Sequence, residues 1–291
     1  MSITATTDDR TLQQVPEAQP KSRRRWFTHS AYGFGVAALA VFILGPVLIL
    51  LVSAFALEWY YPSLVPQVWS LQWWGTILHG AHFLHAIALS FTFAPVVTLV
   101  SAAICLPAAY AFARVDFPGK RAMMMVIFAT NAFPKMGLYI AMAGLFYAFN
   151  LMGTFPGVVI VQLLNTLVTM TWIPAASFSA VPRSLEEAAR DVGASRWKTF
   201  WRVTFPLARP GIVVAAILTF LSSLDEAQGT FLIGAPKYIT MPVKMYTLVS
   251  SYPAAASAVF AILLTLPSLV LLLFIRKYLF SETLASGYRL R

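Results

Sequence analysis

Ionisable side chains are scarce in this chain of 291 residues, so the places where they gather are the first candidates for chemistry. The densest cluster is the stretch EAARDVGASRWKTFWRVTFP at 187–206, which holds two acids and four basic residues. Four further polar residues interrupt long apolar runs, namely Asn131, Lys135, Asp225 and Glu226. A charge in apolar surroundings is costly unless water or a partner meets it, so these four are candidates to contact a polar solute.

Two kinds of chemistry find no support in the residue types. No nucleophile, base and acid occur in a catalytic pattern, so we predict that the chain is not an enzyme. His79, His82 and His85 repeat at a spacing of three, but the third histidine rotates away from the first on a helix. Because zinc needs a fuller ligand set, we do not predict a metal site there.

The composition indicates an integral membrane protein. Hydrophobic residues make up 59% of the chain, charged residues 11%, and the mean hydropathy is +0.72. An ordinary soluble domain carries about 25% charged residues, and a membrane-spanning helix needs about 20 apolar ones in a row. The single cysteine, Cys105, lies in an apolar run, which excludes an internal disulfide.

We predict an all-α bundle of six spans that follows a cytoplasmic tail at residues 1–30. The predicted spans are 31–57, 86–113, 122–149, 155–180, 210–233 and 255–275. The loop between the fourth and the fifth span is 181–209. All 21 basic residues except Lys135, Lys237 and Lys244 then fall on the side that holds both termini. The positive-inside rule makes that side cytoplasmic, so the net charge of +10 reflects topology and not nucleic-acid binding.

The loop itself reads as a helix, a glycine turn and a second helix. Ser184 and Glu187 have the spacing of a capping box, and Gly193 supplies a left-handed end. Ser195 is placed to cap the second helix, which we expect to stop at Pro206. The local pattern therefore predicts two short helices at the cytoplasmic face.

Three functions have to be considered for such a loop. It could be an amphipathic segment at the interface, held by Trp197 and Trp201, or a docking surface for a soluble partner. A DNA-binding helix-turn-helix is excluded, because a loop of under thirty residues tethered to the bilayer at both ends cannot enter a groove freely.

A family resemblance favours docking. Glu187-Ala-Ala, three residues, Gly193, nine residues and Val203-Thr-Phe-Pro206 resembles the EAA signature of ABC importer permeases, which is Glu-Ala-Ala, three residues, Gly, nine residues and Ile-x-Leu-Pro. Val203 and Phe205 are apolar substitutions in that pattern. The resemblance implies a type I permease fold whose loop helix is a coupling helix seated on a cytoplasmic ATPase. The coupling residues that it implies are Ser184, Glu186, Glu187, Ala188, Ala189 and Gly193.

The resemblance also implies partners. The chain has no phosphate-binding loop of the Gly-x-x-x-x-Gly-Lys type, so ATP and Mg²⁺ should bind a separate ATPase dimer, with no cofactor in this chain. The expected assembly is a heterodimer with a second permease in the bilayer of a bacterial inner membrane. An extracytoplasmic solute-binding protein completes it, and no nucleic acid takes part.

The solute is less clear from the residues. Ser223-Leu-Asp-Glu226 and Met241-Pro-Val-Lys-Met-Tyr246 resemble permeases of the spermidine/putrescine type, which predicts a polyamine, an aminophosphonate or a related small polar solute. The segment from Phe133-Pro134 to Thr154 resembles carbohydrate permeases equally well, so a carbohydrate or polyol is the alternative. An autonomous secondary transporter is a further alternative, but neither inverted repeats nor a set of ion-binding residues is seen.

Lys135 is a departure from the polyamine group, where an acidic residue follows the proline of the third span. A positive charge there disfavours a polycationic solute. Lys135 and Asp225 should also lie at similar depth, about 20 Å from the cytoplasmic edge at the helical rise. We therefore expect Lys135, Asp225, Glu226 and Asn131 to line the translocation path, with Lys135 and Asp225 forming or exchanging an ion pair.

Overall fold

The structure is a computed structural model that describes the backbone of residues 22–287 and the side chains of residues 33–273. Helix α1, Ser22–Ser53, belongs largely to a unit of its own that ends at Leu50. It begins before the predicted span at 31, so residues 22–30, which we assigned to the tail, are helical. The predicted tail at residues 1–21 lies outside the described residues. The apolar side chains of α1 between Gly33 and Ser53 are exposed.

The second unit begins with a short hairpin and a short helix. Strands β1, Ala56–Glu58, and β2, Val68–Trp69, pair antiparallel. Helix α2, Gln72–His79, follows, and the indole N–H of Trp74 donates a hydrogen bond of 2.9 Å to the carbonyl of Ala54. This contact fixes α2 against the start of the hairpin.

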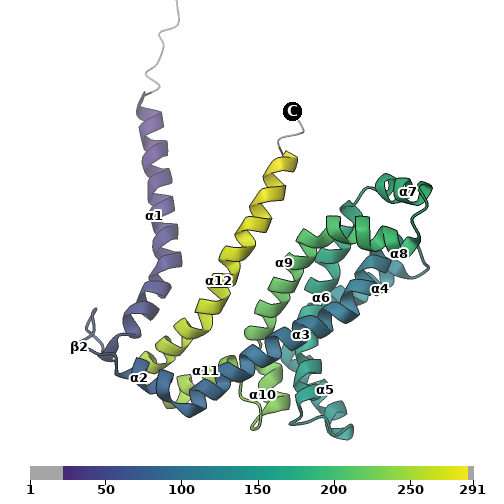
Figure 1. Ribbon diagram of the computed structural model, residues 1–291. Coiled ribbons are helices and arrows are strands. Elements are labelled where there is room, and N and C mark those ends of the chain that lie inside the picture. Colours follow the sequence, from purple (N-terminus) through teal and green to yellow (C-terminus); the bar gives the residue numbers. More distant parts are fainter. Residues whose placement is uncertain (1–21, 288–291) are drawn as a thin grey trace, which may run out of the picture. The chain divides into compact units, whose positions relative to one another are not determined.

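Three long helices form the core of this unit. They are α3, Ala81–Arg114, α6, Phe155–Ala180, and α9, Phe205–Leu224, and each packs on the other two (Figure 1). From the start to the end of α3, the buried side chains contact α6 residues of increasing residue number and α9 residues of decreasing residue number. Helices α3 and α6 therefore run in the same direction, and α9 runs in the opposite direction.

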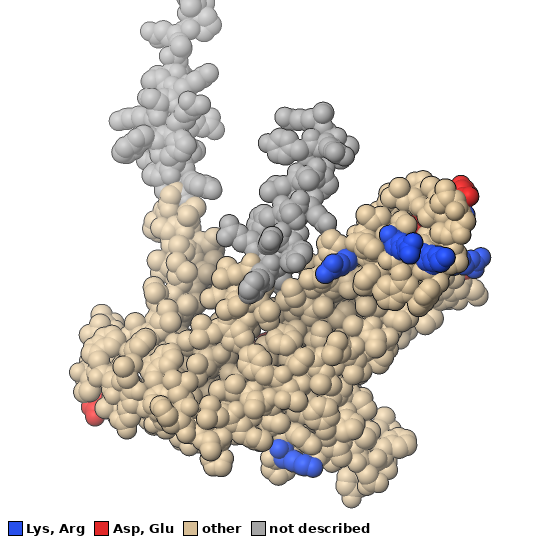
Figure 2. Space-filling view, viewed as in Figure 1, with Lys and Arg blue, Asp and Glu red and all other residues tan. Residues whose placement is uncertain are grey.

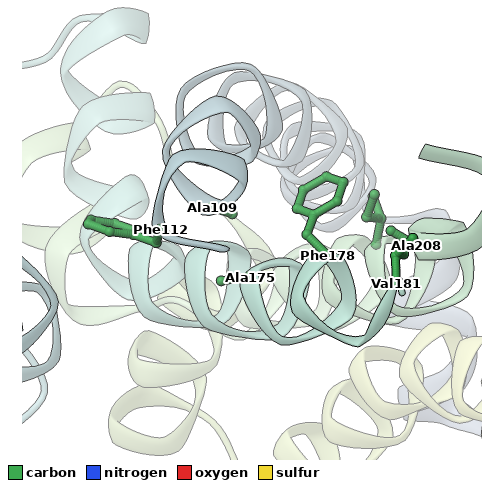
Figure 3. Packing of buried hydrophobic residues seen from close by; sticks show 7 residues of the cluster. Ala109, Phe112, Ala175, Phe178, Val181 and Ala208 are labelled. Atoms are coloured by element: carbon green, nitrogen blue, oxygen red, sulfur yellow. The ribbon is translucent and has the colours of Figure 1, made fainter. Parts of the chain in front are cut away.

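The buried cluster at one end of these helices is the part of the core that supports the predicted loop. Ala109 and Ala175 lie between the ribbons of α3 and α6, and their small side chains let the two helices approach closely (Figure 3). Phe178 is 1% exposed and packs in the same cluster with Ala208 at the start of α9. The ends of three long helices are thus joined next to residues 181–209.

Among the described residues, five helices are long and apolar enough to cross a membrane. They are Gly33–Ser53, Ala81–Arg114, Phe155–Ala180, Arg196–Leu224 and Ala254–Leu273. The fourth predicted span, 155–180, coincides with α6, and the sixth, 255–275, lies within α12, Ala254–Gly287. By length, the prediction of six uninterrupted spans is therefore wrong for the described residues.

The third predicted span, 122–149, is the one that fails. It consists of α4, Lys120–Ala129, and α5, Lys135–Ala148, with a break between them. Pro134 disfavours helical geometry in the residue before it, and it stands at the N-cap of α5. Together α4 and α5 carry the chain from the end of α3 back to the start of α6.

The fifth predicted span, 210–233, also differs at both ends. The helical path begins at Arg196 with α8, Arg196–Thr199, continues through a π-helical turn η1, Phe200–Thr204, and enters α9 directly. Helix α9 stops at Leu224, and the chain forms a separate short helix α10, Gln228–Gly234. Helix α11, Met241–Ser251, then leads to α12.

Candidate functional site

The predicted coupling loop is present as a surface helix followed by a glycine turn. Helix α7 spans Arg183–Asp191, and Gly193 has a φ of 88°, the left-handed geometry that the sequence predicted. The predicted capping box is wrong, because α7 has Pro182 as its N-cap and no side-chain cap hydrogen bond. The helix starts two residues earlier than a cap at Ser184 would give, which places Ser184 inside its first turn.

The second predicted helix exists but does not stop at Pro206. The Ser195 hydroxyl accepts a hydrogen bond of 3.3 Å from the N–H of Lys198, so that predicted cap is confirmed. A proline inside an α-helix removes a donor and clashes with the turn before it. Here the π-turn η1 precedes the proline, and the N–H of Phe205 bonds five residues back to the carbonyl of Phe200. The wider turn lets the helix pass through Pro206.

Glu186 is the anchor that holds α7 from below. Its carboxylate is 2.9 Å from the guanidinium of Arg114 at the end of α3, and it accepts a hydrogen bond of 2.7 Å from the Thr204 hydroxyl in η1. Arg114 also donates to the carbonyl of Val181 at 2.8 Å. The ion pair is buried, with 8% of the Arg114 side chain and 9% of the Glu186 side chain exposed. One carboxylate therefore joins α7, α3 and the start of α9.

The other predicted coupling residues lie on the outside of this anchor. Ser184, Glu187, Ala188 and Gly193 are exposed, and Ala189 is half-buried. In Figure 2 the charges on this face of the molecule gather over α7, α8 and the start of α9, while most of the surface elsewhere carries none. The geometry thus separates two neighbouring acids, since Glu186 points inward and Glu187 points outward.

The second candidate site lies where two helices are interrupted. Asn131 and Lys135 are exposed at the break between α4 and α5, and Asp225 is exposed just after the end of α9. Asp225 precedes α10, which packs against α5, the helix that Lys135 begins. Among the described side chains, however, no contact within 4.0 Å joins the two, so this conformation does not contain the direct ion pair that we predicted.

Glu226 lies at the same site but is buried. Its carboxylate accepts hydrogen bonds from the N–H groups of Gly229 at 2.7 Å and Thr230 at 2.8 Å, which are the first orphan donors of α10. We expected Glu226 inside a continuous fifth span and lining a path. The structure instead places it in the connection between α9 and α10, where it caps α10.

A chain of buried hydrogen bonds extends from this cap. The Gln162 amide donates to the Thr230 hydroxyl at 2.8 Å, and its carbonyl oxygen accepts from Ser223 at 2.6 Å. Asn165 donates to the Tyr139 hydroxyl at 2.8 Å. Polar side chains of α5, α6, α9 and α10 therefore connect these helices to one another.

The same region is closely packed. A Cβ on Gly229 would lie 2.9 Å from Val161 and 3.0 Å from the ring of Tyr139, so α10 approaches α5 and α6 as closely as glycine allows. The exposed Asp225 therefore lies beside a close contact of α10 with α5 and α6.

The three histidines do not converge. His79 ends α2, with its Nδ1 atom 3.0 Å from the carbonyl of Gly75, whereas His82 and His85 belong to α3. Within the described residues no group of three potential ligands could hold a metal ion.

Arg114, Thr204 and Tyr139 are the site residues that sequence reasoning missed. Arg114 carried a weak indication, as a basic residue at the end of a predicted span. Nothing nearby in the sequence identified Glu186 as its partner. Thr204 and Tyr139 look like ordinary helix residues, and only their contacts across the fold mark them.

Comparisons with known proteins agree with the helical architecture. Residues 103–283 match the family model described as "Binding-protein-dependent transport system inner membrane component". The trehalose transport system permease protein SugB of Mycobacterium tuberculosis is 30% identical over 220 residues, which cover 74% of this chain and 80% of that protein. The diacetylchitobiose uptake system permease protein NgcG of Streptomyces coelicolor is 28% identical over 197 residues, covering 64% of this chain and 63% of that protein.

A solved structure shares the fold. A chain of the bacterial ABC transporter involved in the import of the acidic polysaccharide alginate superposes with a TM-score of 0.66 at 19% identity. The match covers 90% of this chain and 99% of that one. SugB and NgcG are named for trehalose and diacetylchitobiose, so these two relatives agree with the alternative resemblance to carbohydrate permeases and not with the predicted resemblance to spermidine/putrescine permeases. The family match and the shared architecture together place the chain among the binding-protein-dependent inner membrane components, as an integral membrane permease subunit of an ABC importer that translocates its solute and is not an enzyme.

Proposed function

We propose that this chain forms half of the translocation path for a carbohydrate, and that it receives the sugar from an extracytoplasmic binding protein. The observation that carries the proposal is the pair of exposed charges, Lys135 and Asp225, at the ends of two interrupted helices. Interrupted helices are tolerated at membrane depth where they line a cavity. The names of the two relatives support a carbohydrate, and the exposed Lys135 disfavours a polycation.

The side chains around this break have the chemistry that a sugar needs. Hydroxyl groups both donate and accept hydrogen bonds, so they can be met by an ammonium, a carboxylate and an amide, here Lys135, Asp225 and Asn131. The ring of Phe133, beside the start of α5, is 59% exposed, and the ring of Phe231, on α10, is 49% exposed. An aromatic face beside a few polar groups is a common composition of small-molecule sites.

The partners follow from the surfaces that the chain leaves open. We place α7 against a cytoplasmic ATPase dimer that binds ATP and Mg²⁺, with both chain termini on that side. A second permease would cover the exposed apolar side chains of α4, such as Met125 and Val126. The broken pair α4–α5 would then serve as a span that borders the path between the two permeases.

The structure also offers a route for coupling. Thr204, which bonds Glu186, and Asp225 lie at the two ends of one helical stretch, about 30 Å apart at the helical rise. When ATP closes the ATPases and moves α7, the Glu186 anchor would pull on the base of α9. Because α9 is continuous, that movement would displace Asp225 at its far end and change the path.

The solute class is tested on the solute-binding protein that we propose as the partner of this permease. Trehalose, diacetylchitobiose, spermidine and 2-aminoethylphosphonate would each be titrated into the purified binding protein in a calorimeter. We expect micromolar binding of a carbohydrate and no heat from spermidine. Binding of spermidine or the aminophosphonate without any carbohydrate would overturn the proposal and restore the polyamine-type prediction.

The path residues are tested by charge reversal in the reconstituted transporter. Lys135→Glu and Asp225→Lys should each lower uptake of the cognate solute by about ten-fold, or about 1.4 kcal/mol, while ATPase assembly is unchanged. The double swap should recover part of the uptake if the two charges act on one another. Both residues are exposed, so the matched control is Lys237→Glu, another exposed basic residue, which follows α10. Normal uptake in both single variants would exclude these residues from the path.

A further inference from the structure

A large cavity opens next to the coupling loop and is not used by the proposed path. Its volume is about 950 Å³, near the upper end of the range for pockets that hold organic ligands. Its walls come from α3, the end of α6, α7 and the helical segment from Arg196 to Phe205. The apolar lining includes Ala103, Leu106, Tyr110, Phe178, Phe200 and Phe205.

The depth of the cavity matches one leaflet of a membrane. Its lining on α3 extends from Ala102 to Arg114, which is about 18 Å along the helix. Half of a hydrocarbon core is about 15 Å thick, so the cavity reaches from the end of α3 through most of one leaflet. Ala103 and Pro107 are exposed as well as lining the cavity, so it is open along the side of α3. An acyl chain could enter there from the bilayer.

The outer end of the cavity is cationic. Arg183, Arg190 and Arg196 line it and are exposed, and Glu187 is the one exposed acid in the lining. Arginine suits a phosphate group because its planar fork donates several hydrogen bonds. Trp197 and Trp201 also line the cavity, and tryptophan is a side chain typical of the headgroup region of a bilayer.

Arg114 adds an independent indication of an anionic ligand. Its side chain is more than nine-tenths buried and lines the cavity. One end of its guanidinium bonds Glu186 and Val181, but its Nε atom is buried without a hydrogen-bond partner. A buried donor of a charged group is costly to leave unpaired. An acceptor oxygen reaching into the cavity would remove that cost.

We propose that this cavity binds an anionic phospholipid, with its phosphate among the arginines and one acyl chain along α3. The lipid would fill the space beneath α7 and hold the coupling helix against the end of α3. The proposal rests on the chain being a permease with α7 at the membrane surface, but it does not depend on the solute. Cationic side chains near a membrane surface are attracted to anionic lipid headgroups, which favours phosphatidylglycerol over phosphatidylcholine.

Native mass spectrometry of the intact transporter tests the site. The complex would be incubated with equal amounts of phosphatidylglycerol and phosphatidylcholine in mild detergent, and the retained lipids would be counted. Wild type should retain phosphatidylglycerol preferentially. Ala103→Trp, which fills the cavity from an exposed position, should reduce that retention at least five-fold. Ile104→Trp is the matched control, since Ile104 is exposed on the same helix and does not line the cavity, and it should behave like wild type.

The cationic rim is tested separately, so the result does not depend on one tryptophan variant being folded. Arg183→Gln with Arg196→Gln should remove the preference for the anionic lipid, whereas Arg202→Gln, an exposed arginine outside the lining, should keep it. Wild type that retains both lipids equally, or no lipid, would overturn the proposal, as would full retention by Ala103→Trp. Because the readout is bound lipid, a wrong assignment of the solute would leave it unchanged.

Discussion

Replacing Glu186 with alanine is expected to destabilise the permease and to abolish transport. The change leaves the Arg114 guanidinium buried without its counter-charge, and removing one partner of a buried pair costs about 3–5 kcal/mol. It also removes the acceptor for the Thr204 hydroxyl, so α7 loses its connection to the base of α9. We expect the apparent melting temperature of the purified complex to fall by on the order of 10 °C. Thermal unfolding followed by tryptophan fluorescence measures the shift.

A graded series distinguishes the ion pair from simple loss of a side chain. Glu186→Gln keeps an acceptor for Thr204 and Arg114 but removes the charge, so its melting temperature should lie between wild type and alanine. The matched control is Glu187→Ala, one residue away and exposed, which should leave the melting temperature unchanged. Equal thermal stability in Glu186→Ala and Glu187→Ala would show that the anchor does not hold the loop.

The second large effect is expected from Glu187→Lys, which should uncouple transport without unfolding the protein. Glu187 is exposed on the outer face of α7, where we propose that the ATPase docks. Reversing its charge leaves the anchor below untouched and changes the surface that the partner meets. Uptake should fall at least ten-fold, and solute-stimulated ATP hydrolysis should fall with it. Uptake and ATPase assays on the reconstituted complex, with co-purification of the ATPase, measure these losses.

Gly193→Val tests the same surface through the backbone. A Cβ at this position would meet no atom within 4 Å, so the substitution acts through the left-handed φ of 88° alone. Left-handed geometry costs a residue with a side chain about 1–2 kcal/mol, which should shift the turn after α7 and weaken docking. Lys198→Gln, an exposed change outside this turn, is the control. ATPase binding and stimulated hydrolysis at wild-type levels in both Glu187→Lys and Gly193→Val would contradict a docking role for α7.

Most of the helices could be predicted from the sequence, because the properties that define them are local. Hydrophobic length alone located the helix at 155–180 and most of the helix from 81 to 114. The turn at Gly193 and the cap at Ser195 were also predictable, since each depends on atoms within three or four residues. The family resemblance came from the same local stretch, through the spacing from Glu187 to Pro206.

The helix interruptions were harder to predict, because hydrophobicity does not distinguish a broken helix from a continuous one. Residues 122–149 are apolar enough for one span, yet the chain breaks before Lys135. Pro134 indicated such a break. Pro206 also lies inside a helical stretch, but it does not end the helix, because the π-helical turn η1 precedes it. Which proline ends a helix depends on whether its neighbours can absorb the missing hydrogen bond.

The roles of adjacent acids were decided by the tertiary structure. In sequence, Glu186 and Glu187 are neighbouring acids with nothing to show which of them is buried, and the same holds for Asp225 and Glu226. Folding brings Arg114 and Thr204 to Glu186, and it points Glu226 at the orphan N–H groups of α10. A buried carboxylate needs charged or hydrogen-bonding partners. For Glu186 these partners come from other helical segments, α3 and η1, and not from its own helix. The composition and local spacing therefore determined that the chain is a membrane permease with a surface helix between two of its spans. The packing of α3, α6 and α9 decided which carboxylates became internal anchors and which stayed exposed for a partner or a solute.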